Sequence, residues 1–297
     1  LLVAAYGELT GVDIFYWFAT SDIGFGPPMG KWQLSTPAQI GMFPAPALML
    51  RKGCIRRGQP ALVERRTLSE VWSRTVPRLP EEAGFDPNRD TLDPATAARE
   101  HQNGNLSPLT YLTGGVEVEF GSGRTQIAEL NRLVDTKNTT VRSNTGEFSW
   151  NYGSGLCTIN APAAQGAIGD LASGGMIQLD SITINSRNEY ASVVAVAMDD
   201  QPLATSGQVL LQIGTTARPY GWKTESATNN LQRIVSLGSS PWNMAETKLE
   251  MTIKNPGLTQ ATLLDANGVA VEQIPVSRQG QTRSINLPAN AMYVILR

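Results

Sequence analysis

Two runs near the middle of the chain, "ASVVAVAMD" (191–199) and "QVLLQIG" (208–214), indicate the fold most clearly. Both are short, rich in β-branched and other apolar residues, and bounded by turn residues, as strands are. Similar runs follow one another after residue 105. They include "VEVEF" (116–120), "TTVRS" (139–143), "GEFSW" (146–150), "LCTIN" (156–160), "MIQLDSITIN" (176–185), "KLEMTIKN" (248–255) and "MYVILR" (292–297). Strands at this spacing predict antiparallel β-sandwich modules, and therefore a mainly β fold.

Two stretches of this region carry further signals. In "QATLLDANGVAVEQIPV" (260–276), the sequence Asp265-Ala-Asn-Gly268 predicts a hairpin turn between two strands. Residues 222–246 are less regular, and we expect a loop and a helical turn there.

The first 105 residues have a mixed α and β pattern. The stretch "LLVAAYGELT" (1–10) predicts a short helix, and the apolar residues of "VDIFYWFAT" (12–20) predict a buried strand. Short segments at 61–67 and 68–75 predict a strand and a helical turn, and 93–104 predicts a capped helix.

Residues 36–53 predict two short helices or one kinked helix. Thr36 is a good N-cap and Pro37 suits the first helical position. Pro44 and Pro46 cannot lie in an unbroken helix interior, and Gly53 is the expected end of the helical segment.

Composition excludes several classes of function. The 297 residues carry a formal net charge of -2, so there is no basic field for nucleic acid, and no run is apolar enough to span a membrane. With one histidine, His101, and two cysteines, Cys54 and Cys157, a zinc site is not expected, and the thiols are expected to be free. We expect no metal and no cofactor. Because the chain begins at Leu1 without a signal-peptide pattern, we expect it to be a piece of a longer protein.

Two sets of residues resemble a known family. The helix "LLVAAYGELT", the strand "GVDIFYWFAT", the loop with "KWQLSTP", the helix "IGMFPAPALMLRKG" and the strand "ALVERR" resemble the last helix-strand-helix of a clan A glycoside hydrolase barrel. The stretch "SNTGEFSWNYGSGLCTINAPAAQGAIG" (143–169) is similar to the β-sandwich that follows the barrel in β-galactosidase-like bacterial hydrolases.

The resemblance implies a remnant of a (β/α)8 barrel over residues 1–105. A β-sandwich domain would follow at 106–247, and then a strand module at 248–297, which could belong to the same sandwich. A closed barrel needs about 250 residues, so most of its strands would precede Leu1. Both catalytic carboxylates of this clan, at the ends of strands four and seven, would then lie upstream. The isolated chain would be structural or glycan-binding, and a poor catalyst.

The end of the expected strand would be the remaining part of the sugar site. The resemblance implies substrate-binding roles for Trp17, Ser21, Asp22 and Trp32, with Trp17 as a stacking floor for a sugar ring. For each aromatic residue, core or loop packing remains the alternative, and Asp22 has the alternative of capping a turn.

Two other functions remain open. A serine esterase would have to use His101, although no G-x-S-x-G elbow is present and Ser122 and Ser154 lie in glycine-rich turns. A non-catalytic carbohydrate-binding module would need a platform of exposed rings, drawn from Trp150, Tyr152, Tyr220, Trp222 and Trp242.

The expected partners follow from the same resemblance. We expect an oligo- or polysaccharide of β-linked sugars as ligand, and a bacterial protein that is secreted or periplasmic rather than cytoplasmic. A barrel strand without its neighbours would expose apolar surface, which predicts self-association through residues 1–55.

Overall fold

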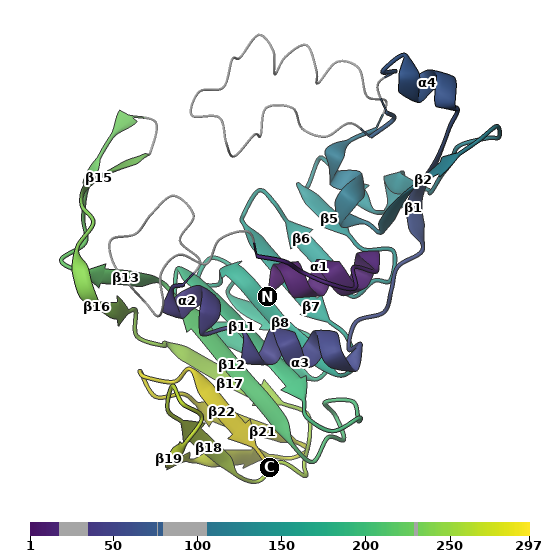
Figure 1. Ribbon diagram of the computed structural model, residues 1–297. Coiled ribbons are helices and arrows are strands. Elements are labelled where there is room, and N and C mark those ends of the chain that lie inside the picture. Colours follow the sequence, from purple (N-terminus) through teal and green to yellow (C-terminus); the bar gives the residue numbers. More distant parts are fainter. Residues whose placement is uncertain (18–34, 76, 80–105, 229–230) are drawn as a thin grey trace. The chain divides into compact units, whose positions relative to one another are not determined.

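The structure is a computed structural model that describes residues 1–17, 35–75, 77–79, 106–228 and 231–297, and strands dominate it. The chain divides into two compact units. The larger, here called the sandwich unit, comprises Leu1–Ala5, Asp13–Ile55 and Ser154–Arg297, and the smaller unit comprises Tyr6–Val12 and Arg56–Gly153. The prediction of a mainly β fold with antiparallel sheets is confirmed (Figure 1).

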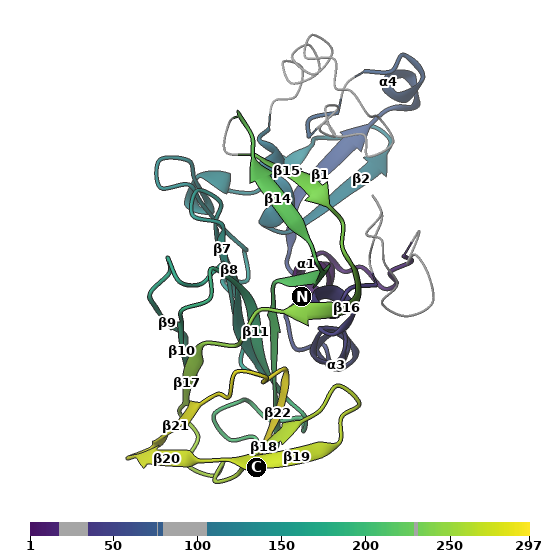
Figure 2. The same cartoon turned by 90° about the vertical axis from the view of Figure 1, so that its left-hand side faces the viewer.

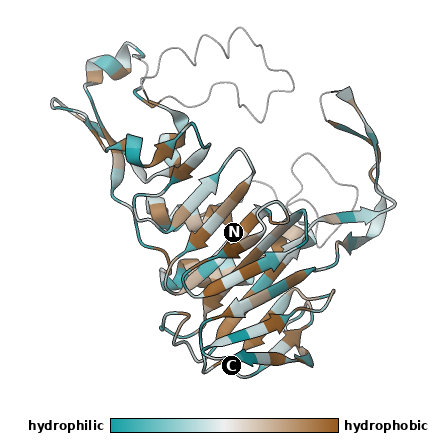
Figure 3. Ribbon diagram, turned by 180° about the vertical axis from the view of Figure 1, so that it is seen from behind, coloured by the Kyte–Doolittle hydropathy of each residue, from teal (hydrophilic) through white to brown (hydrophobic). Residues whose placement is uncertain are grey.

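Two antiparallel sheets form the sandwich unit. One contains strands in the order β19-β18-β22-β12-β11-β8-β7, and the other has the order β20-β21-β17-β10-β9. Their bounds are β7 (Leu156–Asn160), β8 (Ala164–Asp170), β9 (Met176–Gln178), β10 (Ile182–Ser186), β11 (Tyr190–Ala197), β12 (Val209–Thr215), β17 (Leu249–Ile253), β18 (Ala261–Leu264), β19 (Ala270–Ile274), β20 (Val276–Gln279), β21 (Thr282–Asn286) and β22 (Tyr293–Leu296). Figure 3 shows apolar and polar residues alternating along several of these strands.

The core lies between the two sheets. Val193 and Ala195 of β11 and Leu211 of β12 face Ile184 of β10 and Met251 of β17 in one buried cluster. Each of these side chains is fully buried, and burial of a large aliphatic side chain contributes about 1.5–3 kcal/mol. The alternation that the sequence shows therefore places one face of each strand in this core.

Helices cover the other face of β11 and β12. These helices are α2 (Pro37–Ile40) and α3 (Pro44–Lys52), and they follow α1 (Leu2–Thr10) in the chain. Gln212, on this second face of β12, accepts a hydrogen bond from the backbone N–H of Ala45 at 2.7 Å and donates to the carbonyl of Gly41. The Tyr293 hydroxyl donates to the same carbonyl at 2.6 Å. Because both faces of β11 and β12 are covered, these strands are buried along almost their whole length.

A long hairpin arm leaves the end of β12. It consists of β13 (Ala217–Tyr220), β14 (Lys223–Ser226), β15 (Gln232–Ser236) and β16 (Ser239–Met244). β13 pairs with β16, and β14 pairs with β15 beyond them (Figures 1 and 2). We expected a loop and a helical turn at 222–246. Most of this segment instead forms strands, because cross-strand pairing makes strands of a segment whose own periodicity is weak, while Thr228, between β14 and β15, lies in a 3-10 turn.

The smaller unit is a mixed structure. Its elements are β1 (Pro60–Arg66), α4 (Leu68–Trp72), the 3-10 helix η1 (Pro108–Leu112), β2 (Gly115–Phe120), β3 (Gln126–Ile127), the 3-10 helix η2 (Leu130–Arg132), β4 (Val134–Asp135), β5 (Thr140–Arg142) and β6 (Phe148–Asn151). β1 is parallel to β2 and antiparallel to β3, and β5 is antiparallel to β4 and β6. Tyr6 stacks on Phe148 with the ring centroids 5.1 Å apart.

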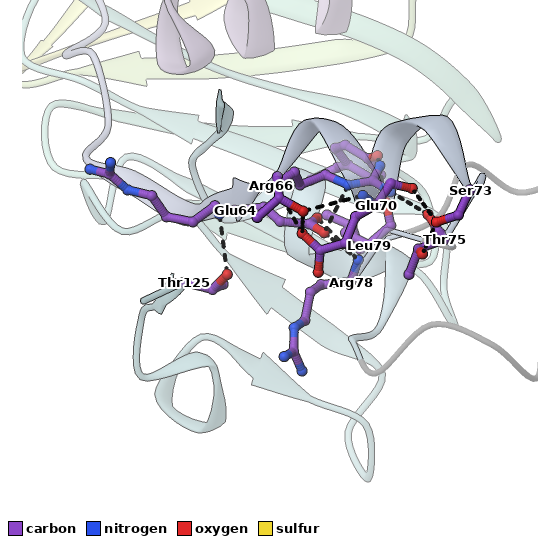
Figure 4. A network of polar contacts seen from close by, with 11 residues as sticks. Glu64, Arg66, Glu70, Ser73, Thr75, Arg78, Leu79 and Thr125 are labelled. Atoms are coloured by element: carbon purple, nitrogen blue, oxygen red, sulfur yellow. Dashed lines mark hydrogen bonds and ion pairs between the residues drawn. The ribbon is translucent and has the colours of Figure 1, made fainter. Parts of the chain in front are cut away.

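A polar network holds the start of α4 beside β1 (Figure 4). The buried Glu64 carboxylate accepts two hydrogen bonds from the backbone N–H of Arg78, at 3.1 and 3.0 Å. Thr67 and Glu70 form a reciprocal capping box, and the backbone N–H of Thr67 is the largest cause of the lowered pKa of Glu70. Because these bonds join side chains of one segment to backbone N–H groups of another or of the helix start, the network has a structural role.

The expected buried strand at 12–20 is wrong where it can be checked. Residues 12–17 form neither helix nor strand, and Asp13–Trp17 are exposed. Residues 18–20 lie outside the described part of the chain, as does the expected helix at 93–104. A strand needs hydrogen-bonded neighbours, and no described strand pairs with residues 12–17. Apolar composition alone therefore did not make this segment a strand.

The N-terminal helices are where the sequence places them. The predicted helix at 1–10 is α1, and the prolines of 36–53 separate α2 from α3. Gly53 ends α3 in the left-handed conformation, with φ of 59°. A remnant of an α/β barrel is not shown. The boundaries of the two units differ from those of the expected domains at 1–105, 106–247 and 248–297. Strands β17 to β22 belong to the same two sheets as β7 to β12.

Candidate functional site

A cavity of about 410 Å³ opens in the sandwich unit where the base of the hairpin arm meets β12 and the turn before β22. We call it the Trp242 cavity. Its volume lies in the range of small-molecule sites. The lining residues come from three segments: Ile213 and Thr215; Trp242 and Met244–Thr247; and Ala289–Met292.

Strand pairing turns the aromatic side chain toward the cavity. Pro219 of β13 lies opposite Trp242 of β16, and Ala217 lies opposite Met244. Because side chains alternate along a strand, Trp242 and Met244 share the face that lines the cavity, whereas Asn243 lies on the other face. The ring of Trp242 is half-buried and is therefore held in place along one side.

Backbone contacts fix the walls of the Trp242 cavity. The Thr215 hydroxyl donates to the carbonyl of Ala245 at 2.6 Å, and the Thr247 hydroxyl donates to that of Ala291 at 2.8 Å. The backbone N–H of Thr247 donates to the carbonyl of Ala289 at 2.8 Å. These bonds occupy the threonine hydrogens, so the threonines shape the cavity rather than offer it donors.

Two exposed polar side chains remain at the cavity. They are Glu246, the one charged residue among the described lining residues, and Asn290. A carboxylate only accepts hydrogen bonds, whereas a carboxamide both donates and accepts. The cavity thus combines an aromatic ring and apolar side chains with a few polar groups. This arrangement suits a ligand that has one apolar face and several hydroxyl groups.

The residues expected at the sugar site lie elsewhere. Trp17 is 51% exposed at the end of a described segment and does not line the Trp242 cavity. Ser21, Asp22 and Trp32 lie outside the described residues. Nothing in the structure therefore tests whether these four residues form a site, and their substrate-binding role stays a prediction.

The five aromatic residues considered as a platform have different surroundings. Trp150 lies 6.2 Å from the ring of Tyr6 in the smaller unit, and Tyr152 is exposed in a turn there. In the hairpin arm, the guanidinium of Arg218 lies 5.3 Å from the centroid of Trp222. Of the five, only Trp242 lines the cavity. The alternation of apolar and polar residues in "PWNMAE" (241–246) was the signal that could have indicated its orientation.

Other kinds of centre receive no support from the described residues. His101 lies outside them, while Ser122 and Ser154 are exposed in a bend and a turn. Cys54 and Cys157 are buried and neither forms a disulfide, in agreement with the prediction. Among the described residues no group of three or more potential ligand side chains could hold a metal ion. None of the helices that the structure describes has the length and apolarity to cross a membrane.

Comparisons with known proteins return no relatives. No family model matches the chain, and neither curated proteins nor solved structures give a significant match. The function therefore has to be argued from the residues and the geometry of this chain alone.

Proposed function

We propose that this chain is a glycan-binding part of a glycoside hydrolase that acts on β-linked glycans, and that the Trp242 cavity binds a sugar ring. The cavity is the observation that carries the proposal. The apolar C–H face of a pyranose ring packs on an aromatic plane, which Trp242 offers, while its hydroxyl groups can pair with Glu246 and Asn290.

Binding without hydrolysis follows from the same lining. Glycoside hydrolysis by the common mechanisms uses two carboxyl groups, about 5 Å apart in retaining enzymes and about 6.5–9.5 Å apart in inverting ones. Among the described residues that line the Trp242 cavity, Glu246 is the only one with a carboxylate side chain. The cavity therefore supports ligand binding and not catalysis, in agreement with catalytic carboxylates located on another part of a barrel enzyme.

The resemblance to β-galactosidase-like hydrolases supplies the wider context. The segment 40–53, which resembles the last barrel helix, packs through α3 on the sheet of the sandwich unit. We propose that this packing is the connection between a barrel and its accessory sandwich. A bacterial origin and a secreted or periplasmic location remain parts of this proposal.

Affinity electrophoresis in gels that contain β-linked galactans or glucans tests the proposal with the full chain. We expect retardation that Trp242→Ala reduces at least tenfold in apparent affinity, which corresponds to about 1.4 kcal/mol. Trp72→Ala is the matched control, because Trp72 is 92% exposed on α4 and does not line the cavity. Equal loss in both variants, or none in Trp242→Ala, would contradict the proposal.

We also propose self-association through residues 1–55. The support is the exposed segment 12–17, in which Ile14 is 62% and Tyr16 is 88% exposed. A run of neighbouring exposed apolar side chains is typical of an interaction surface. Sedimentation velocity should show a concentration-dependent dimer or larger species, and Ile14→Ser with Tyr16→Ser should shift it to the monomer. A monomer at all concentrations would refute this.

A further inference from the structure

The charge of the Trp242 cavity points to the class of sugar it accepts. We infer that Glu246 makes the cavity selective for uncharged sugars and against sugars that carry a carboxylate, such as hexuronates. This inference rests on the proposed function, because it requires that the cavity binds a sugar ring at all.

The first observation is the sign of the charge. Of the eleven described residues that line the cavity, Glu246 carries a charge, and none of them is a lysine, an arginine or a histidine. Nor does the Glu246 carboxylate form an ion pair with any other residue in the described ranges. Its negative charge is therefore not neutralised by an ion pair with any described residue, so it would repel an anionic ligand in the cavity.

The second observation is that the backbone beside Glu246 is held on both sides. The side-chain amide of Asn188 donates to the carbonyl of Glu246 at 2.8 Å and accepts from the backbone N–H of Lys248 at 2.9 Å. Between these two residues, the backbone N–H of Thr247 is bonded to Ala289. The backbone of Glu246, from which the carboxylate side chain extends, therefore has a fixed position beside the cavity. Since Asn188 is buried, this clamp is shielded from water.

Three basic residues on neighbouring segments do not change the sign of the charge at the cavity. Lys248 and Arg187 lie beside the Asn188 clamp, but neither lines the cavity. Arg218 lies one residue from Pro219 on β13, and strand alternation places it on the face opposite to the cavity, where its guanidinium contacts Trp222. A ligand carboxylate in the cavity would therefore meet the negative charge of Glu246, and no described lining residue would offer it a cation.

Neutral sugars and the matching acidic sugars would interact differently with Glu246. The carboxylate of Glu246 accepts hydrogen bonds from the hydroxyl groups of a neutral hexose, and charge-assisted bonds of this kind are stronger than neutral ones. A hexuronate of the same ring geometry carries a carboxylate in place of the C6 hydroxymethyl group, which would add a second negative charge beside that of Glu246. Like charges in one site repel each other, and salt weakens this repulsion. The rejection of hexuronates should therefore be strongest at low ionic strength.

Ligand-observed NMR titration of the full chain tests the inference. The probes are methyl β-galactoside with methyl β-galacturonide, and methyl β-glucoside with methyl β-glucuronide, at pH 7 in low and high salt. We expect the neutral member of each pair to bind at least tenfold more tightly at low salt. Glu246→Gln should reduce that ratio to below threefold. Glu272→Gln, which removes an exposed carboxylate from β19, should leave it unchanged.

The outcomes separate the two proposals. Equal binding of neutral and acidic sugars that Trp242→Ala abolishes would overturn the selectivity and leave the glycan site intact. A selectivity that survives Glu246→Gln would also overturn the role of Glu246. Absence of binding by any of the four sugars, together with no retardation on glycan gels, would overturn both proposals.

Discussion

Gln212 offers the sharpest test of how the N-terminal helices are held on the sandwich. Its side chain is fully buried, and its amide pairs with the backbone N–H of Ala45 and the carbonyl of Gly41. The first N–H groups of a helix have no partner within the helix, and no side chain of α3 itself caps them. Gln212 therefore supplies from a distant strand what the local sequence of α3 lacks.

The change Gln212→Met keeps the volume of the side chain and removes both polar atoms. The Ala45 N–H is then buried without a partner, which costs about 1–3 kcal/mol. The Gly41 carbonyl keeps its hydrogen bond from the Tyr293 hydroxyl at 2.6 Å, so the loss of its bond from Gln212 destabilises the protein less. The expected decrease in the free energy of unfolding is about 2 kcal/mol, because only one of the two backbone groups becomes unsatisfied.

Urea unfolding and hydrogen exchange measure this effect. The midpoint should fall at an unchanged m-value, and the Ala45 amide should exchange faster. Gln260→Met, at an exposed position before β18, is the matched control and should change stability by less than about 0.5 kcal/mol. Tyr293→Phe alone should lower the free energy of unfolding by about 1 kcal/mol. The double variant with Gln212→Met should lose more than the two single variants together, because the Gly41 carbonyl then has no partner. A stable single variant whose Ala45 amide remains protected would refute the role of Gln212.

Three further changes test local features. Gly169→Ala should lower the free energy of unfolding by about 3 kcal/mol or more, read from urea midpoints, because φ is 123° and a Cβ would lie 1.8 Å from the Gly155 carbonyl oxygen. Glu147→Gln should lower the free energy of unfolding by about 1.5–3 kcal/mol in the same assay. The reason is that the buried Glu147 carboxylate accepts hydrogen bonds from the backbone N–H and the Nε–H of Arg56, each at 2.8 Å. An unchanged midpoint would contradict this. The backbone N–H of Val269, together with that of Asn267, holds the pKa of Asp265 below its ordinary value, so its stabilising effect is complete above about pH 4 and is lost as the pH falls further. Asp265→Asn should therefore flatten the decline of thermal stability below pH 4, and an identical decline in both proteins would disprove the assignment.

Local chemistry was sufficient where one short segment decides its own conformation. The predicted turn at 265–268 forms: the Asp265 carboxylate accepts backbone N–H groups of Asn267 and Val269, and Gly268 has φ of 81°. The prolines separate α2 from α3, and Gly53 ends α3. Alternating apolar residues gave most of the strands, although "MIQLDSITIN" (176–185) forms two strands, β9 and β10, rather than one.

The candidate site could not be found in this way, because its parts are distant in the sequence. The cavity combines β12, the end of the hairpin arm and the turn before β22, and Trp242 faces it only because β16 pairs with β13. The residues that the family resemblance selected, of which Trp17 is the described one, depended on an expected strand that residues 12–17 do not form. An exposed edge or an apolar run reveals nothing about its partners until the other strands are placed.

By itself the sequence determined that this chain is mainly β, where its helices break and where its clearest hairpin turns, because propensity, proline and glycine act within a few residues. Only the tertiary structure decided which apolar runs are buried and that Gln212 holds a helix end. It also decided that one tryptophan and one carboxylate meet at a cavity. Burial and hydrogen bonding are satisfied by whichever residues the fold brings together, so they depend on contacts that no single segment specifies.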